Sequence, residues 1–261
     1  MRTARSKMPS SYTISQHVAF ILSLILTSLV LNGCIITADP DNIDKIQGSG
    51  LLETRTIDVS DFSKISTVLP GSLVISQGIE ESLELSAQAN LFPYIEIFVD
   101  DDGLLHIETE EDVNLEPTRP ISILLTVKSI NELNFAGDGL VQIDTLATTQ
   151  LEVTLAGSGD IEINQLTAVL LDISLAGSGD MLLAGTVDEQ NIMLAGSGDI
   201  EARELISSKA EIEIAGSGSA NVNVSEELTA LIVGSGSVRY LGNPTVETTI
   251  VGSGTVGPLG E

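Results

Sequence analysis

The chain has no tryptophan, one cysteine and few aromatic or basic residues, and each shortage argues against a class of protein. Aromatic residues make up 3% of its 261 residues, and 37 acidic residues outnumber 11 basic ones, for a formal net charge of -26. No basic stripe is present to displace counterions from phosphates, so we expect no nucleic-acid partner. The acidity also disfavours electrostatic binding to anionic lipid. Hydrophobic residues nevertheless reach 43%, which predicts an aliphatic core rather than a disordered acidic tail.

The single cysteine, Cys34, follows a segment with the pattern of a secretory signal. Arg2, Arg5 and Lys7 precede an apolar run of 14 residues at 18–31. That run is shorter than the roughly 20 residues that a transmembrane helix needs. It ends in Leu-Asn-Gly-Cys, which resembles the lipobox of bacterial lipoproteins, where the cysteine is acylated and becomes the first mature residue. A plain secretory signal with an incidental cysteine is the alternative.

We therefore expect a lipoprotein signal peptide at residues 1–33, a tether at 34–47 and a single domain at 48–261. Acylated Cys34 would attach the protein to a membrane, since each buried CH₂ contributes about 0.8 kcal/mol and two chains hold stably. With its only thiol acylated, the mature chain would have no disulfide. Ile35, the residue after the cysteine, is not Asp. By resemblance to enterobacterial sorting, this favours the outer membrane of a Gram-negative envelope.

A glycine-rich turn recurs seven times in the second half of the chain. Its first glycine stands at 137, 157, 177, 196, 216, 234 and 252, at intervals of 18 to 20 residues. A fixed period of this size is typical of a solenoid. Between turns, apolar and polar residues alternate, as in Leu151-Glu-Val153-Thr-Leu155, which is the pattern of strands with one buried face. No window offers a convincing helical stripe.

Short strands at this period, without helices, predict an all-β fold, a β-solenoid with rungs of about 20 residues. Rungs stack about 4.8 Å apart, so equivalent residues form columns. The residue before each turn would then form a buried aliphatic column, and the glycines would form the corners. The repeats cover residues 131–257. Residues 48–130 are β-rich but less regular, and we expect them to form wider opening rungs continuous with the repeats.

Motifs in the opening part carry a resemblance to a known family. They are Gly48-Ser-Gly50, Arg55-Thr-Ile57-Asp-Val59, Pro70-Gly71, Leu91-Phe-Pro-Tyr-Ile95 and Val99-Asp-Asp-Asp-Gly103, followed by the AGSGD repeats. In this order, over residues 48–257, the sequence resembles the putative auto-transporter adhesin head GIN domain family of bacterial envelope proteins. The resemblance implies a right-handed parallel β-helix, and the family name suggests adhesion. The family supplies no catalytic residues. The last two repeats are shortened to 18 residues, which is consistent with a tapering C-terminal cap.

Two polar columns run through the turns. The serine column, which includes Ser158, has no base beside it, because the only histidines are His17 in the signal and His106 in a strand-like run. A repeated serine without a base is not a nucleophile. No copy of the turn is followed by the Lys and helix of a phosphate loop.

The second column contains three aspartates, Asp160, Asp180 and Asp199. Carboxylates about 4.8 Å apart repel one another by roughly 1 kcal/mol per neighbour in water. Two interpretations remain open. The aspartates cap turns by accepting hydrogen bonds from nearby backbone N–H groups, or they form a weak Ca²⁺ site, since Ca²⁺ prefers carboxylate and carbonyl oxygens. Apart from that Ca²⁺, no cofactor is expected.

The sequence therefore predicts a lipid-anchored envelope protein with a non-catalytic solenoid that serves adhesion or binds an envelope protein or a polysaccharide. A Ca²⁺-stabilised scaffold is one alternative. A polysaccharide-active β-helix enzyme is another, because some right-handed β-helices are lyases or hydrolases. Such enzymes need placed carboxylate pairs and often aromatic stacking platforms, and this chain has few aromatics. We expect no enzymatic activity.

Overall fold

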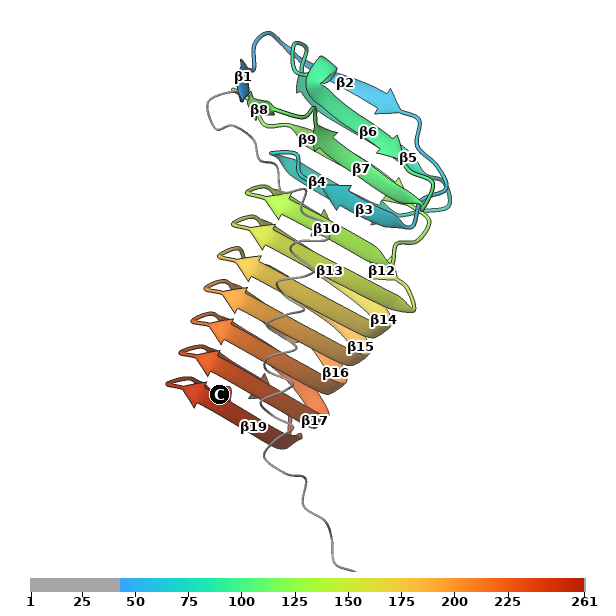
Figure 1. Ribbon diagram of the computed structural model, residues 1–261. Coiled ribbons are helices and arrows are strands. Elements are labelled where there is room, and N and C mark those ends of the chain that lie inside the picture. The colour runs from blue at the N-terminus through green and yellow to red at the C-terminus, as the bar shows by residue number, and fades with distance from the viewer. Residues whose placement is uncertain (1–42, 261) are drawn as a thin grey trace, which may run out of the picture. The chain divides into compact units, whose positions relative to one another are not determined.

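The described part of the chain consists almost entirely of strands. The computed structural model describes residues 43–260 (Figure 1). The predicted signal peptide at 1–33, with His17, and the predicted lipidation residue Cys34 lie outside this range. Within it, one short 3₁₀ helix is the only helical element, and no helix there is long and apolar enough to cross a bilayer. The predicted all-β class is confirmed.

The strands divide into an opening part and a repeat part. The opening part contains β1 (Asp44–Gln47), β2 (Leu52–Ile57), β3 (Lys64–Thr67), β4 (Ser72–Gln77), β5 (Ser82–Gln88), the 3₁₀ helix η1 (Phe92–Tyr94), β6 (Ile95–Val99), β7 (Leu104–Thr109), β8 (Val113–Glu116) and β9 (Ser122–Val127). The repeat part contains β10 (Glu132–Gly137), β11 (Leu140–Ile143), β12 (Leu146–Ala147), β13 (Gln150–Gly157), β14 (Asp160–Gly177), β15 (Met181–Gly196), β16 (Asp199–Gly216), β17 (Ser219–Gly234), β18 (Ser237–Leu241), β19 (Thr245–Gly252) and β20 (Thr255–Pro258).

Consecutive repeats pair in parallel, one rung apart. Leu155 lies opposite Leu175, which lies opposite Leu194, and Leu194 lies opposite Ile214. The rungs of about 20 residues that the glycine spacing predicted are therefore confirmed.

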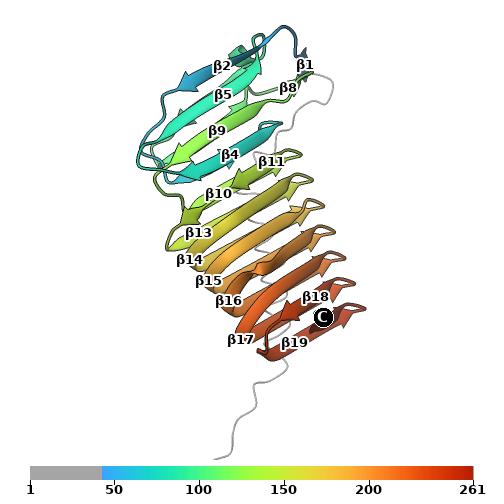
Figure 2. The same cartoon turned by 180° about the vertical axis from the view of Figure 1, so that it is seen from behind.

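Each rung contributes to two sheets. We call them the pre-turn sheet, whose strands end at the glycine turn, and the post-turn sheet, whose strands begin after it. The pre-turn sheet contains β10, β13, the C-terminal parts of β14 to β17, and β19. The post-turn sheet contains β11, the N-terminal parts of β14 to β17, β18 and β20. In Figure 1 the pre-turn sheet faces the viewer, and in Figure 2, which is turned by 180°, the post-turn sheet does.

The core lies between the two sheets and is made of aliphatic columns. The residue before each turn is buried, as predicted, with at most 3% of its surface exposed in Phe135, Leu155, Leu175, Leu194, Ile214 and Ile232. Full burial of a Leu or Ile side chain contributes about 1.5–3 kcal/mol. The column therefore adds a similar increment of stability with each rung. Ile250, in the last rung, is 41% exposed.

The opening part does not form a simple series of parallel rungs. The rung of β3 and β4 lies between the rung of β10 and β11 and that of β7 and β9, because β3 pairs with both β10 and β7, and β4 with both β11 and β9. Beyond β7 and β9 the pairing becomes antiparallel, through β6 on β7, and β5 on β9 and β2. An exposed strand edge invites pairing with other chains. At the N-terminal end of the solenoid, the sheets finish in antiparallel strands, and β2 and β6 each pair on one side only among the described strands.

Strand β1 lies inside the predicted tether. It pairs in parallel with β8, with Asp44 opposite Val113 and Gln47 opposite Glu116. Residues 44–47 therefore belong to the sheet structure at the N-terminal end of the domain.

Candidate functional site

The glycine turn is held by backbone hydrogen bonds that continue from rung to rung. The N–H groups of Ser158 and Gly159 donate to the carbonyl of Gly137 at 3.0 and 2.9 Å, and that of Asp160 donates to Gly139 at 2.9 Å. A side chain on the second glycine of a later turn would collide with the carbonyl of the glycine below it, as at Gly179 over Gly159. Glycine is therefore required for the stacking itself, which explains why the turn repeats.

The three aspartates lie in one column, as predicted, and each bonds the rung that follows. The Oδ1 atom of Asp160 accepts a hydrogen bond from the N–H of Asp180 at 3.2 Å, and Asp180 accepts from Asp199 at 3.0 Å. Asp199 accepts from both the N–H and the hydroxyl of Ser219, at 3.1 and 2.6 Å. This geometry favours the interpretation as turn caps.

The carboxylate column is exposed to solvent. Among the described residues, no group of three or more His, Cys, Asp or Glu side chains is arranged to hold a metal ion. Calcium binding by Asp160, Asp180 and Asp199 stays a prediction, to which we return in the Discussion.

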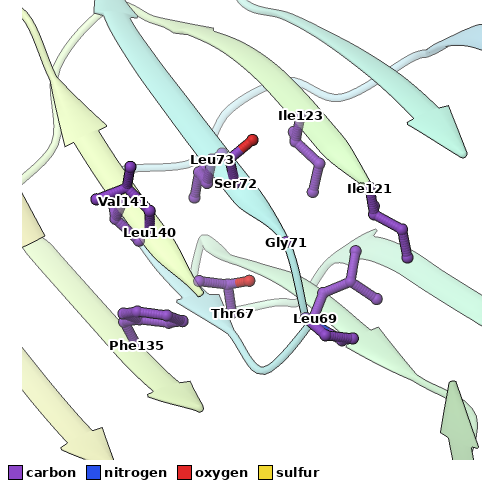
Figure 3. Close-up of a pocket in the computed structure, with 11 residues that line it drawn as sticks. Thr67, Leu69, Gly71, Ser72, Leu73, Ile121, Ile123, Phe135, Leu140 and Val141 are labelled. Carbon is purple, nitrogen blue, oxygen red and sulfur yellow. The ribbon is translucent and has the colours of Figure 1, made fainter. Parts of the chain in front are cut away.

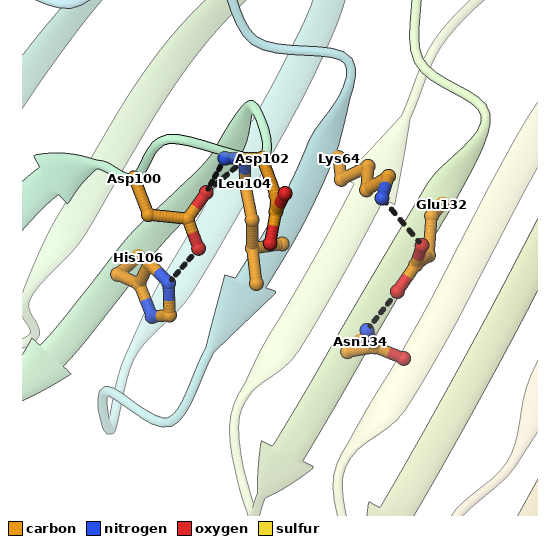
Figure 4. A network of polar contacts seen from close by, with 7 residues as sticks. All are labelled: Lys64, Asp100, Asp102, Leu104, His106, Glu132 and Asn134. Carbon is orange, nitrogen blue, oxygen red and sulfur yellow. Dashed lines mark hydrogen bonds and ion pairs between the residues drawn. The ribbon is translucent and has the colours of Figure 1, made fainter. Parts of the chain in front are cut away.

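His106, the one histidine among the described residues, has a charged partner and a ring partner. Its Nε2 atom lies 3.0 Å from Oδ2 of Asp100 (Figure 4). Its ring stacks on Phe98 with centroids 4.6 Å apart. Asp100 closes the turn between β6 and β7, where its Oδ1 accepts from the N–H groups of Asp102 and Leu104. The bond from Leu104, and then that from His106, lowers the pKa of the Asp100 carboxyl. This pair belongs to the β6–β7 hairpin of the opening part, so His106 is not beside the serine column of the repeat turns.

A row of polar side chains on the outer surface of the pre-turn sheet was not foreseen. It consists of Lys64, Glu132, Glu152, Asp172, Asn191, Glu211, Thr229 and Glu247, each opposite the next. We call it the acidic row. From Glu132 onward, each member stands five residues before the first glycine of a turn, so the same alignment that revealed the turns contains this signal.

Neighbouring members of the acidic row are linked by hydrogen bonds and charge. The Nζ atom of Lys64 lies 4.0 Å from Oε2 of Glu132, and Oε1 of Glu132 accepts a hydrogen bond from Asn134, in its own strand, at 2.7 Å (Figure 4). Asn191 donates to Asp172 at 2.9 Å. Burial raises the pKa of the Glu152 carboxyl, and the charges of Glu132 and Asp172 raise it further. The row thus carries five carboxylates along the rungs, with Asn191 and Thr229 between them.

A small cavity in the core is too small to hold a substrate. A void of about 10 Å³ lies where the turn before β4 meets β10 and β11, lined by Thr67, Leu69, Pro70, Gly71, Ser72, Leu73, Ile121, Ile123, Phe135, Leu140 and Val141 (Figure 3). A cavity needs roughly 10–15 Å³ to hold one water molecule. The void therefore holds one water at most.

The fold defines a β-solenoid whose polar groups lie in outward rows. The chain belongs to the family described as "Putative auto-transporter adhesin, head GIN domain", whose profile matches residues 61–244. This confirms the resemblance drawn from the motifs.

Solved structures agree with this assignment. A structure from Parabacteroides distasonis described as a putative lipid binding protein is 31% identical, with a TM-score of 0.72, covering 83% of this chain and all of its own. A putative adhesin from Bacteroides fragilis is 28% identical, with a TM-score of 0.75, covering 82% of this chain and all of its own. A putative adhesin from P. distasonis is 25% identical, with a TM-score of 0.68 and 83% of this chain covered. No curated protein matches the chain.

Proposed function

We propose that this protein is a lipid-anchored, non-catalytic adhesin of the bacterial envelope that binds its partner along the outer surface of the pre-turn sheet. The acidic row is the observation that carries the proposal. It presents carboxylates, with one amide and one hydroxyl among them, at a regular spacing of about 4.8 Å on a stiff support, which suits a repeated polymer such as a polysaccharide, or an envelope protein. The family and its structural neighbours are described as adhesins or binding proteins, which supports binding over catalysis.

Lipid binding, which the description of one neighbour names, has less support in this chain. The void of about 10 Å³ is far too small for an acyl chain. The surface of the pre-turn sheet is acidic, and acidic surfaces repel anionic headgroups.

The binding surface is tested by charge removal on one face at a time. We expect a variant with Glu152 and Glu211 changed to Gln to weaken capture of the partner from envelope extract, or of purified glycans on an array. The matched control changes Glu162 and Glu201, which lie on the post-turn sheet, to Gln. Equal capture by both variants, or an unchanged attachment phenotype on deletion of the gene, would contradict the proposal.

The proposed anchor at Cys34 is tested separately. Wild-type protein expressed with its signal should partition into the detergent phase of a cloud-point extraction, because two or more acyl chains hold a protein stably in lipid. A Cys34→Ala variant should move to the aqueous phase. If both proteins partition alike, the protein is not lipidated at this residue.

A further inference from the structure

The two ends of the solenoid are finished in different ways. At the N-terminal end, the antiparallel strands β6, β5 and β2 follow the last parallel rung, and the outer edges of β2 and β6 have no partner among the described strands. Leu91, the residue before η1, is fully buried there. At the C-terminal end, β19 pairs only with β17, and β20 only with β18, among the described strands. The expected C-terminal cap is absent from residues 43–260. The last rung presents an unpaired strand edge.

Core side chains are uncovered at this edge. Ile250 is 41% exposed, whereas Ile232, its equivalent one rung earlier, is fully buried. Val246 and Val256 are only partly buried. Natural sheets usually protect such edges with charges, prolines or a covering element, and terminal repeats of solenoids need a polar outer face. Residues 243–260 carry one charged side chain, Glu247.

The backbone groups that face the open edge follow from the register. The N–H of Glu152 donates to Asn131, in the preceding rung, at 2.9 Å, and Glu152 occupies the same column as Glu247. The N–H of Glu247 therefore points back to β17. The backbone groups of successive residues alternate in direction, so those of the residues on either side of Glu247 point to the open edge. The N–H and C=O groups that face the edge are those of Val246, Thr248 and Ile250.

A second copy of this chain fits the edge by two-fold symmetry. In an antiparallel pairing centred on Thr248, that residue faces itself, and Val246 faces Ile250 of the other copy. All of these residues present their backbone groups to the partner, so they form hydrogen-bonded pairs. The apolar side chains then meet on the core side.

Charge also permits this register. On the outer side, Glu247 faces Thr249, so no acid faces an acid, although the chain carries a net charge of -26. In β20 the N–H groups of Thr255 and Leu259 point back to the preceding rung. Because the direction alternates along the strand, Pro258 faces the open edge, where its lack of an N–H group costs no hydrogen bond within the sheet. Strand β19 contains no proline.

We propose that the C-terminal edge of the solenoid pairs antiparallel with the same edge of a second copy, centred on Thr248 and forming a tail-to-tail dimer. A two-fold axis generates such a self-complementary contact. An eight-residue strand spans about 26 Å and the sheets lie about 10 Å apart, for an end face of roughly 260 Å² in projection. Because this area is small for a protein interface, the dimer is weak and depends on concentration.

The pairing does not depend on the proposed lipid anchor, but its consequence does. Strand β1, where the chain enters the domain, lies at the opposite end from β19 (Figure 1). A tail-to-tail dimer therefore places the two points of entry at its far ends. With the anchor at Cys34, this arrangement joins copies on two facing surfaces.

Sedimentation equilibrium on residues 44–261, which form one compact unit, tests the pairing without the anchor. Between about 1 and 500 µM we expect a reversible dimer. Thr248→Pro and Ile250→Lys should each weaken association by about tenfold or more. Val251→Lys is the matched control, because Val251 is 58% exposed but points to the outer surface, and it should leave association unchanged. A melting curve for each variant confirms folding.

A monomer at the highest concentration, or a dimer that Thr248→Pro leaves intact, would overturn the proposal. Capture of an unrelated β-strand peptide by a chain that stays monomeric would likewise overturn it and assign the edge to another partner.

Cysteine cross-linking tests the register itself. Residues 44–261 contain no cysteine, so Thr248→Cys introduces a single thiol that faces its symmetry mate at a Cα separation of about 5.5 Å, within disulfide range. Glu247→Cys is the control, since its symmetry mate lies diagonally across the strands, beyond about 7 Å. Mild oxidation should cross-link the first variant at least tenfold faster. Equal rates would refute this register.

Discussion

Adding one methyl group to a turn glycine in the middle of the stack should destabilise the protein more than the same change at the first turn. Gly177 has a φ of 140°, in a region that is essentially restricted to glycine and costs other residues about 1–3 kcal/mol. A Cβ there would also collide with the carbonyl oxygen of Gly157, with the C and N atoms of Gly157 only 3.0 and 3.1 Å away. Gly137 has a φ of 138°, but a Cβ there meets nothing nearer than Phe135, at 3.9 Å.

The two substitutions therefore separate conformational strain from stacking. Gly137→Ala should cost about 1–3 kcal/mol from strain alone. Gly177→Ala should force the turns apart and weaken the bonds from Ser178 and Gly179 to Gly157, at 2.9 and 3.2 Å. Each contributes about 0.5–1.5 kcal/mol, so the total becomes about 2–6 kcal/mol.

Urea unfolding followed by far-ultraviolet circular dichroism measures the difference as a shift in midpoint at constant slope. Ser178→Ala is the control in the same turn; it should change stability by less than about 0.5 kcal/mol, because the side chain is exposed. If Gly177→Ala costs no more than Gly137→Ala, the stacked carbonyl is not what requires glycine, and the reasoning fails.

Three further predictions concern the carboxylates. The folded-state pKa of Asp100 is lowered, so the stability that it contributes is present above the unfolded pKa of about 3.9 and is lost as pH falls through the folded value. The melting temperature of Asp100→Asn should therefore fall less than that of the wild type between about pH 5 and 2. Parallel profiles of melting temperature against pH would contradict this. Glu152→Gln should stabilise the protein at pH 7 by about 0.2–1 kcal/mol, because it removes like charges opposite Glu132 and Asp172, and a loss of stability on urea unfolding would count against charge repulsion in the acidic row. The aspartate column is tested with a variant in which Asp160, Asp180 and Asp199 are changed to Asn. If the carboxylates only cap turns, millimolar Ca²⁺ should have the same small effect on the melting temperatures of the wild type and of this variant. A rise in the melting temperature of the wild type that the variant abolishes would establish the calcium site.

The repeat was predictable because its cause is local. A rung needs two short alternating strands and a corner that tolerates close backbone approach, and the spacing of glycines reports both. For this reason the buried residue before the turn, such as Leu175, and the alignment of the three aspartates followed from the sequence. The bond partners of the aspartates did not, because a carboxylate and a backbone N–H one rung apart are neighbours only through the pitch of the coil.

The acidic row and the pair of His106 and Asp100 could not be predicted from the sequence. Alternation shows that Glu152 points outward but not that it joins the other acids in one row, since that depends on the register of every rung. His106 looked isolated in its own strand. Its partner Asp100 and its stacking neighbour Phe98 lie across a turn, and only antiparallel pairing of β6 with β7 brings them together.

The sequence by itself determined the strand class, the period of the rungs and the glycine corners, because these depend on side-chain alternation and local backbone geometry. Only the tertiary structure decided how the solenoid begins and ends. It placed β3 and β4 between the rung of β10 and β11 and the later strands β7 and β9, finished one end in antiparallel pairs and the other in the parallel strand β19. Those choices depend on which strand edges find partners over long sequence separations, and edge pairing leaves little trace in the pattern of any single segment.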